Sequence, residues 1–442
     1  MKTPRTPPTI PDLMSQLTPD QFSRVIAFVS SNSPTNKYLH WDKLIRYPPP
    51  AGLTHEEWWL GLKISRHALY KDIPLTDKHG QPFKFLVTDP IPEQLHHIDL
   101  GAGGRIGVPA PVTNPETRNQ YYVSSLIEEA ITSSQLEGAT TTREVAKAML
   151  RAARPPRDHS ERMILNNFLT MQQIGQIKDQ TLTPELIFEL HRLVTEETLP
   201  DPSAAGRLRR TNENIFIGDD RGQIFHVPPP AETLADRMAA MCDFANSKTP
   251  AYFVHPVLRS IMLHFWLAYD HPFVDGNGRT ARALFYWSML HYGFWLCEYI
   301  SISRIILKAP AQYGRAFLYT ETDDNDLTYF ILHQIDVMRR AVEELHKYIA
   351  MKAARLQAME RELRSMVLFN HRQRALISHA LRHPNYLYTI DGHKLSHHVV
   401  YETARTDLLN LKERGILEAH KVGRTWYFTP AADLEAKLQQ LS

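Results

Sequence analysis

The chain has 442 residues, and 43% of them are hydrophobic, so it can form about two to four domains of about 100–200 residues with packed cores. Its formal net charge of +2 is too balanced to indicate nucleic-acid binding by the whole molecule, so any DNA contact must be local. The two cysteines, Cys242 and Cys297, lie in apolar segments and indicate neither a disulfide framework nor a zinc cluster.

The chain begins with Met-Lys-Thr-Pro-Arg-Thr-Pro-Pro, which lacks the apolar core of a secretion signal. No apolar run approaches the ~18 residues that a membrane helix requires, so we expect a cytoplasmic protein without membrane contact. Residues 1–115 contain many prolines and aromatic pairs such as Trp58-Trp59. We interpret them as an N-terminal accessory region.

Residues 116–180 follow as a predominantly helical region. Its stretch from 121 to 153 is predicted to be helical and contains Ser133-Ser-Gln-Leu-Glu137-Gly138. Ser133 and Glu137 are four residues apart, which places them on one helix face. By itself the pattern is more often an ordinary surface serine and glutamate.

The segment from Asn214 to Pro228 predicts a β-hairpin, because two short apolar strands flank the turn Asp-Asp-Arg-Gly. Two interpretations stay open. The hairpin is an ordinary surface feature, or its exposed edge pairs with an extended segment of a partner. Pro228-Pro-Pro230 closes the hairpin and leads into a helix predicted from about 231 to 247.

Two further predicted helices flank a loop of unusual composition. Apolar residues recur at helical spacing from 255 to 268 and again from 279 to 292. Between them lies His271-Pro-Phe-Val-Asp-Gly-Asn-Gly-Arg-Thr-Ala-Arg282. Phe273 is interpreted as a core anchor, since an aromatic residue in a polar loop mainly fixes that loop against the interior.

The glycines of this loop indicate an anion-binding turn. Gly276 and Gly278 permit backbone angles that let the N–H groups around Asn277 converge where the next helix begins. Such a turn binds phosphates. Arg279 and Arg282 are three residues apart, so we expect both to contact the outer phosphates of a nucleotide.

The remaining polar residues of the loop predict chemistry at that phosphate. Asp275 supplies the carboxylate oxygen that Mg²⁺ prefers, and His271 is expected to take a proton from an attacking hydroxyl. Each feature alone is usually ordinary: a Gly-Asn-Gly turn, a structural histidine, or arginines of a helix in solvent. Their combination predicts in-line transfer at a nucleotide phosphorus.

The pattern His-Pro-Phe-x-Asp-Gly-Asn-Gly-Arg-x-x-Arg resembles the signature of the Fic (Fido) family of nucleotidyltransferases. The resemblance implies a mainly α fold, a Fic-type helical bundle with a β-hairpin flap, and a catalytic core over residues 181–346. It implies Mg²⁺-dependent transfer of AMP from ATP to Ser, Thr or Tyr hydroxyls of proteins. It also implies these roles: general base His271; Mg²⁺ ligand Asp275; nucleotide-binding residues Gly276, Asn277, Gly278, Arg279 and Arg282.

Beside this signature, the segment containing Ser133, Glu137 and Gly138 resembles the family's inhibitory helix. The resemblance implies that Glu137 pairs with Arg282 and blocks the γ-phosphate position. It also implies that the same glutamate supports removal of AMP from modified proteins, and that the protein forms a homodimer. The target is a protein not identified by the sequence, and it includes the chain itself as a candidate.

Residues 366–442 predict three helices followed by a hairpin that turns at 423–424, which is the order of a C-terminal winged helix-turn-helix domain. The segment from Thr403 resembles the recognition helix of bacterial winged-helix regulators. Possible DNA contacts are Arg405, Lys412, Lys421 and Arg424. Dimerisation or substrate docking is an equal alternative, because Glu402, Asp407 and Glu413 dilute the positive face.

Two functions therefore follow from the sequence. The first is a protein adenylyltransferase inhibited by its own Glu137. The alternative is a DNA-binding transcription regulator whose Fic-like core only senses a nucleotide.

Overall fold

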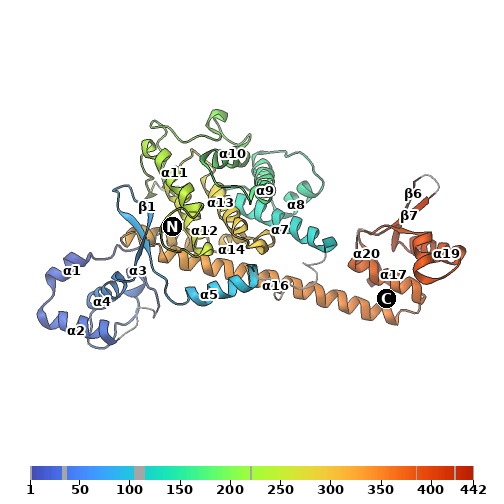
Figure 1. Cartoon of the computed structure of the whole chain (residues 1–442), viewed down its shortest axis with the longest axis horizontal. Helices are drawn as coiled ribbons and strands as arrows, with labels where there is room; N and C mark the ends of the chain where they lie inside the picture. The colour runs from blue at the N-terminus through green and yellow to red at the C-terminus, as the bar shows by residue number, and fades with distance from the viewer. Residues whose placement is uncertain are drawn as a thin grey trace. The chain divides into compact units, whose positions relative to one another are not determined.

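A computed structural model of the chain describes residues 2–31, 37–103, 115–219, 222–384, 386–422 and 425–441. The fold is mainly α-helical, as predicted, with small antiparallel sheets (Figure 1). The chain divides into two units. The first comprises residues 1–106 and 125–342, and the second comprises residues 107–124 and 343–442.

The N-terminal part of the first unit contains a helical cluster and one β-hairpin, in which β1 pairs with β2. The helical cluster packs around the buried Trp59 and Leu60. Its elements are α1 Ile10–Gln16, α2 Pro19–Ser31, α3 Trp41–Leu44, α4 His55–His67, β1 Lys71–Thr76, β2 Pro82–Phe85, α5 Ile91–Ile98 and the π-helical turn η1 Asp99–Gly103.

The rest of the first unit is helical, interrupted by the short hairpin β3–β4. Helix α7 Pro115–Leu136 belongs to this unit from residue 125 onward. The other helices before the hairpin are α8 Arg143–Arg151, α9 His159–Ile177, α10 Pro184–Thr195 and η2 Pro202–Ala204. The hairpin and the elements after it are β3 Ile217–Gly218, β4 Ile224–His226, η3 Ala231–Thr233, α11 Leu234–Ala245, α12 Pro256–Asp270, α13 Asn277–His291, η4 Trp295–Tyr299, α14 Ile302–Leu307 and α15 Pro310–Thr322.

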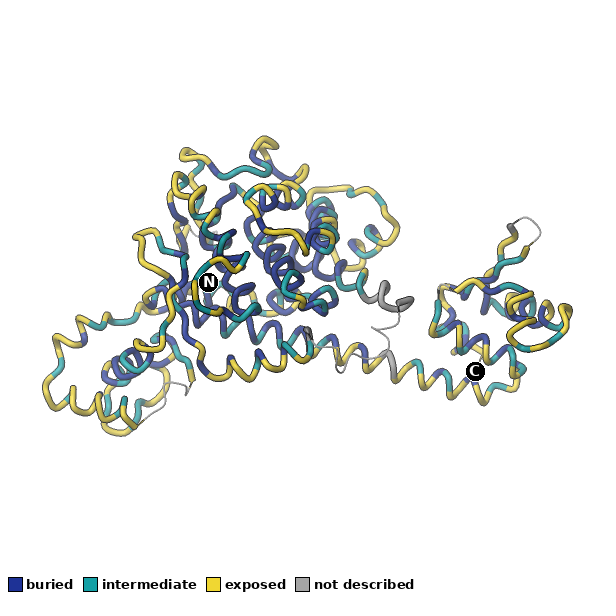
Figure 2. The backbone as a smooth tube through the Cα atoms, in the orientation of Figure 1, coloured by how far each residue is buried: buried dark blue, intermediate teal, exposed yellow. Residues whose placement is uncertain are grey.

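The centre of this core is the helix pair α12 and α13, and nearly every residue of both helices is buried (Figure 2). Helix α12 also contacts α11, and α13 contacts α9 and α10. The predicted helices 255–268 and 279–292 are confirmed. The loop that joins α12 to α13 is therefore held by the best-packed helices of the unit, which limits its movement.

Helix α16 Thr328–Ser365 leads into the second unit, whose elements are α17 His371–Arg382, β5 Tyr388–Thr389, α18 Ile390–His397, α19 Tyr401–Glu413, β6 Leu417–Val422, β7 Thr425–Pro430 and α20 Leu434–Leu441. The strands form one sheet in the order β5-β7-β6. They cover a core that includes Ile377, Leu408 and Phe428. The three helices and the hairpin predicted for residues 366–442 are all present.

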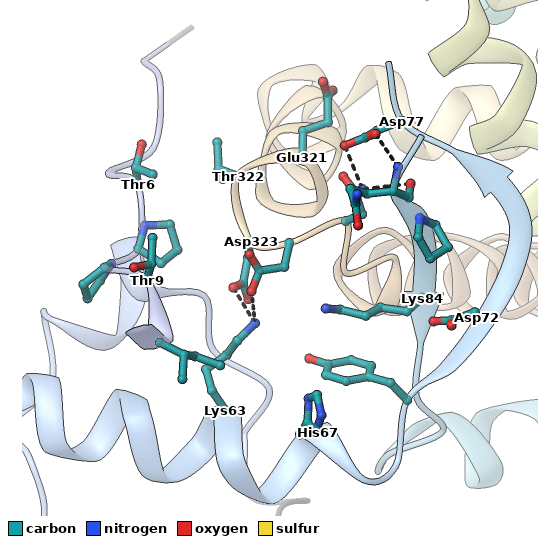
Figure 3. Close-up of a pocket in the computed structure, with 18 residues that line it drawn as sticks. Thr6, Thr9, Lys63, His67, Asp72, Asp77, Lys84, Glu321, Thr322 and Asp323 are labelled. Atoms are coloured by element: carbon teal, nitrogen blue, oxygen red, sulfur yellow. Dashed lines mark hydrogen bonds and ion pairs between the residues drawn. The ribbon is translucent and has the colours of Figure 1, made fainter. Parts of the chain in front are cut away.

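A buried ion pair joins the N-terminal region to the core. Lys63 of α4 donates to Asp323 over 2.7 Å, and both side chains are almost fully buried (Figure 3). Beside this pair lies a polar cavity of about 720 Å³, lined by the segment that leads into α1, by α4, by the β1–β2 hairpin, and by the end of α15 with the residues that follow it. Glu321 lines the cavity and accepts a 2.7 Å hydrogen bond from His226 of β4.

Both cysteines, Cys242 and Cys297, are buried and free. Among the described residues, no helix combines the length and the apolar character that crossing a bilayer requires.

Candidate active site

The loop between α12 and α13 begins and ends with a left-handed backbone. His271, which caps α12, has φ of 45° and ψ of 57°, and Gly276, which precedes α13, has φ of 82°. A non-glycine residue adopts this conformation only when its surroundings hold it there. The loop is thus a constrained turn in which the position of His271 is set by the fold.

The His271 ring has one nitrogen engaged and one available. Its Nδ1 lies 3.3 Å from the carbonyl oxygen of Ala268. Because a carbonyl only accepts, Nδ1 carries the hydrogen and Nε2 keeps a lone pair. Burial of the ring lowers the pKa of His271 to about 4, against the hydrogen bond to Ala268, which raises it. At neutral pH the imidazole is therefore uncharged, the state that a general base requires.

Asn277 closes the loop from within. Its side-chain oxygen accepts from the Phe273 amide over 2.9 Å, and its amide nitrogen donates to the Phe273 carbonyl over 2.8 Å. Phe273 is fully buried, as predicted for a core anchor. The first turn of α13 has N–H groups without partners inside the helix, at its positive end. Asn277 and Gly278 thus present backbone donors to an anion, while the Asn277 side chain only supports the turn.

Asp275 is the exposed carboxylate of the loop, with a side chain 56% exposed. One of its oxygens accepts from the Gly276 amide over 2.6 Å, and the other lies 3.7 Å from Arg279. No group of three or more His, Cys, Asp or Glu residues suited to a metal occurs among the described residues. One carboxylate fits Mg²⁺, which keeps waters and phosphate oxygens as its other ligands.

Arg279 and Arg282 are both buried but have different neighbours. Arg279 donates to the Val194 carbonyl of α10 over 2.9 Å, and its buried Nε has no hydrogen-bond partner. Arg282 donates to the Ser133 hydroxyl over 2.8 Å and to the Ser133 carbonyl over 3.0 Å. Two buried guanidinium groups beside the anion-binding turn suit a highly charged ligand.

Glu137 occupies the space between these groups. Its Oε1 accepts from Arg282 over 2.8 Å. Burial lowers the pKa of Arg282, but the attraction of Glu137, Tyr313 and Glu129, together with the hydrogen bond to Glu137, outweighs that effect and raises it. A Cβ added to Gly278 would lie 2.1 Å from the same carboxylate oxygen. The Glu137 carboxylate therefore sits directly on the first turn of α13.

The predicted helix over 121–153 is wrong in its extent. Helix α7 ends at Leu136, and α8 begins only at Arg143. Gly138 adopts φ of 94°, which reverses the chain after Glu137. Glu137 thus lies in a turn at the end of the helix, although it still reaches Arg282 together with Ser133.

Two residues that sequence reasoning missed hold the loop from outside. His191 of α10 contacts the Asp275 carbonyl over 2.9 Å, and Arg209 donates to the His271 carbonyl over 3.0 Å. Neither stands at a fixed spacing from the motif, so no pattern in the sequence indicates either one.

The predicted hairpin is present as β3 and β4, in antiparallel pairing. Ile224 and Val227 are exposed on it, while His226 is buried and contacts the Tyr269 carbonyl over 2.7 Å. Tyr269 precedes His271 by two residues. The base of the hairpin is therefore anchored beside the candidate site.

The possible DNA contacts occupy the second unit. Arg405 is half-exposed on α19 and lies 3.3 Å from Glu402. The Lys412 and Lys421 ammonium groups lie 5.4 Å and 5.8 Å from the centre of the Trp426 ring. Arg424 lies outside the described residues.

Asp407 does not dilute the positive face of α19, contrary to the expectation from sequence. Its side chain is buried and accepts from Arg372 over 2.7 Å and from Asn370 over 2.7 Å. It therefore ties α19 to the start of α17 and points into the domain.

The chain thus has a helical domain in which the loop between the two central helices forms the candidate active site. Residues 181–289 match the Fic/DOC family. The matched segment includes the motif at 271–282 and agrees with the family resemblance of that motif.

Named relatives match part of the chain. A protein adenylyltransferase Fic from Nematostella vectensis is 35% identical over 168 residues, which are 37% of this chain and 37% of the relative. One from Drosophila willistoni is 34% identical over 139 residues, or 31% of this chain and 25% of the relative. The matched region thus spans between a quarter and little more than a third of the length of these relatives.

A solved structure resembles the chain more extensively. The crystal structure of a Fic family protein from Desulfovibrio desulfuricans G20 covers 78% of this chain and 97% of its own, with a TM-score of 0.52 and 19% identity. At 19% identity, this likeness shows a similar fold and carries no statement about activity.

Proposed function

We propose that the protein is an adenylyltransferase that transfers AMP from ATP to a Ser, Thr or Tyr hydroxyl of a protein. The observation that carries the proposal is the neutral His271, with its free Nε2, beside the first turn of α13. The name shared by the relatives at about 35% identity supports the same activity.

The reaction that suits this geometry is an in-line displacement at the α-phosphorus. The hydroxyl oxygen of the target forms a bond to that phosphorus while the bond to the β-phosphate oxygen breaks. The hydroxyl proton passes to Nε2 of His271, and pyrophosphate leaves. Backbone N–H groups of the α13 turn bind the α-phosphate, and Arg279 and Arg282 bind the outer phosphates.

Mg²⁺ is part of the proposal, with Asp275 as its ligand from the protein. When bound, the ion neutralises charge on the phosphates. Asp275 is suited to this role because its exposed carboxylate stands at the edge of the same turn.

Glu137 inhibits the proposed reaction in the same chain. Its carboxylate pairs with Arg282 and lies on Gly278, where an outer phosphate would otherwise bind. ATP must displace this contact before its phosphates reach Arg282. Each ~1.4 kcal/mol required for that displacement lowers productive binding tenfold. The resemblance of this segment to the family's inhibitory helix implies that the same carboxylate orients a water molecule, so the proposal includes removal of AMP from modified proteins.

The test is covalent labelling by ATP that carries ³²P at the α-phosphate. Glu137→Gly should raise labelling of protein by about tenfold or more, because Arg282 then becomes available to ATP. Glu144→Gly removes an exposed carboxylate from α8 and should leave labelling at the wild-type level. His271→Ala in the Glu137→Gly background should abolish it.

Two outcomes contradict the proposal. If labelling survives His271→Ala, then His271 is not the general base. Absence of label from every variant, even with a cell lysate as a source of targets, favours the alternative in which the Fic/DOC domain only senses a nucleotide.

A DNA-binding role of the second unit is proposed as an additional function. The inward position of Asp407 supports it, because the exposed face of α19 is then more positive than the sequence suggests.

A homodimer is also proposed, on the resemblance of the inhibitory segment alone.

A further inference from the structure

The loop from His271 to Gly276 depends on outside partners for its shape. It contains two left-handed residues, and its internal hydrogen bonds are those of the Asn277 side chain to Phe273 and of the Gly276 amide to the Asp275 carboxylate. The carbonyl groups of His271, Pro272 and Asp275 all accept from residues outside the loop. Since a strained backbone persists only where neighbours determine it, these donors set the geometry of the site.

Arg209 holds the end that carries the base. Its Nε donates to the His271 carbonyl over 3.0 Å, and its backbone N–H donates to the Pro272 carbonyl over 2.8 Å. Its Nη2 donates to the Pro229 carbonyl, just after the β3–β4 hairpin. Arg209 is buried, so water cannot replace these bonds without a change of structure. One guanidinium thus joins the foot of the hairpin to the backbone of His271.

His191 holds the opposite end. Its Nδ1 accepts from the Gly206 amide over 2.9 Å, so the hydrogen is on Nε2, which donates to the Asp275 carbonyl over 2.9 Å. The ring is fully buried and stacks on Phe273 at 3.8 Å with an angle of 10° between the planes.

We propose that Arg209 and His191 are positioning residues with separate tasks: Arg209 orients the base His271, and His191 orients the anion-binding turn that begins at Gly276. The inference rests on the proposed adenylyltransferase function and deepens it. If the proposal is right, Arg209 affects kcat and His191 affects the Kd for ATP. A general role of both residues in folding would not separate the two constants in this way.

The experiment uses the full chain with Glu137→Gly as the active parent. Arg209→Gln should lower kcat for AMP transfer by about tenfold or more, because displacement of a reacting group by about 1 Å can cost about 100-fold. The Kd for ATP with Mg²⁺, measured by calorimetry, should stay within about twofold of the parent. Arg210→Gln is the matched control, because it removes the same charge from the exposed neighbour and should change neither constant.

His191→Phe retains the stacked ring but loses both hydrogen bonds. It should raise the Kd for ATP with Mg²⁺ by about tenfold, because the turn no longer holds its N–H groups in place. His191→Gln has an amide nitrogen that can donate to Asp275 in place of Nε2. It should recover part of the lost affinity, and this rescue distinguishes positioning from loss of packing.

The proposal is overturned if kcat and Kd change together in both variants in proportion to their loss of thermal stability, or if neither constant changes. Failure of the proposed function looks different, because the Glu137→Gly parent itself then transfers no AMP. In that case the Kd for ATP with Mg²⁺ still tests His191.

Discussion

At the scale of single residues, the site depends on two glycines that are used differently. Gly278 leaves room for the Glu137 carboxylate, whereas Gly276 needs both its positive φ and the space next to Thr195. A Cβ on Gly276 would lie 2.6 Å from the Thr195 methyl carbon. The motif thus requires glycine at 276 for backbone conformation and for the close approach of α10.

Gly276→Ala should therefore destabilise the protein more than an alanine at a glycine position that has a positive φ but no close neighbours. Gly222→Ala is the matched control, because Gly222 has φ of 79° but no atom within 4 Å of its added Cβ. We expect the difference in free energy of unfolding between the two variants to be about 1–3 kcal/mol, the usual cost of overpacking. Equal losses in urea denaturation would mean that contact with Thr195 contributes nothing.

At the scale of secondary-structure elements, helix α19 combines a buried and an exposed face with different tasks. Asp407 faces inward and holds Arg372 and Asn370, while Arg405 lies on the exposed side. Burial raises the pKa of Asp407, but its hydrogen bonds to Arg372 and Asn370 outweigh that effect and lower it, so the carboxylate stays charged. The acidic residue thus stabilises the helix without opposing an anionic partner.

Removal of an exposed cation from α19 should weaken binding to DNA. Arg405→Gln should lower affinity for a DNA duplex in fluorescence anisotropy at low salt, and should reduce the salt slope by about one if Arg405 contacts a phosphate. Arg361→Gln on α16 removes the same charge from another exposed position and should have little effect. Equal effects of the two variants, or no binding by the wild-type chain, would contradict a DNA-binding face on α19.

At the scale of the whole molecule, buried histidines couple stability to pH. Burial lowers the pKa to about 3 in His40 and His264, and to about 4 in His191, His271 and His333. An exposed histidine in the unfolded chain titrates near 6.5. Between pH 6.5 and about 4 the unfolded chain thus binds more protons than the folded one, and folding becomes less favourable as the pH falls.

The free energy of unfolding should therefore decrease from pH 7 to pH 5, by up to about 1.4 kcal/mol per pH unit for each such histidine. His333→Gln removes one of these groups and should reduce the pH dependence, whereas His67→Gln, at an exposed position, should not. Urea titrations at a series of pH values measure both. Stability that is constant or increases toward pH 5 would contradict the assignment of these imidazoles as neutral in the folded state.

The local parts of the site could be predicted from sequence because they lie within one short stretch. Helical periodicity located α12 and α13, and the composition of residues 271–282 indicated the anion-binding turn. The end of α7 at Leu136 was missed, because the apolar pattern continues past a chain reversal at Gly138. Asp407 was misjudged, because sequence spacing does not show which face of α19 the domain covers.

The sequence by itself determined the chemistry of the loop, since the residue types that act on a phosphate are consecutive there. It also determined the pairing partner of Arg282, through the resemblance of the segment ending at Gly138. Only the tertiary structure decided how the loop is held, because His191 and Arg209 are far from it along the chain. Contacts of that kind arise from the packing of α10 and the hairpin around the central helices, and no local pattern encodes them.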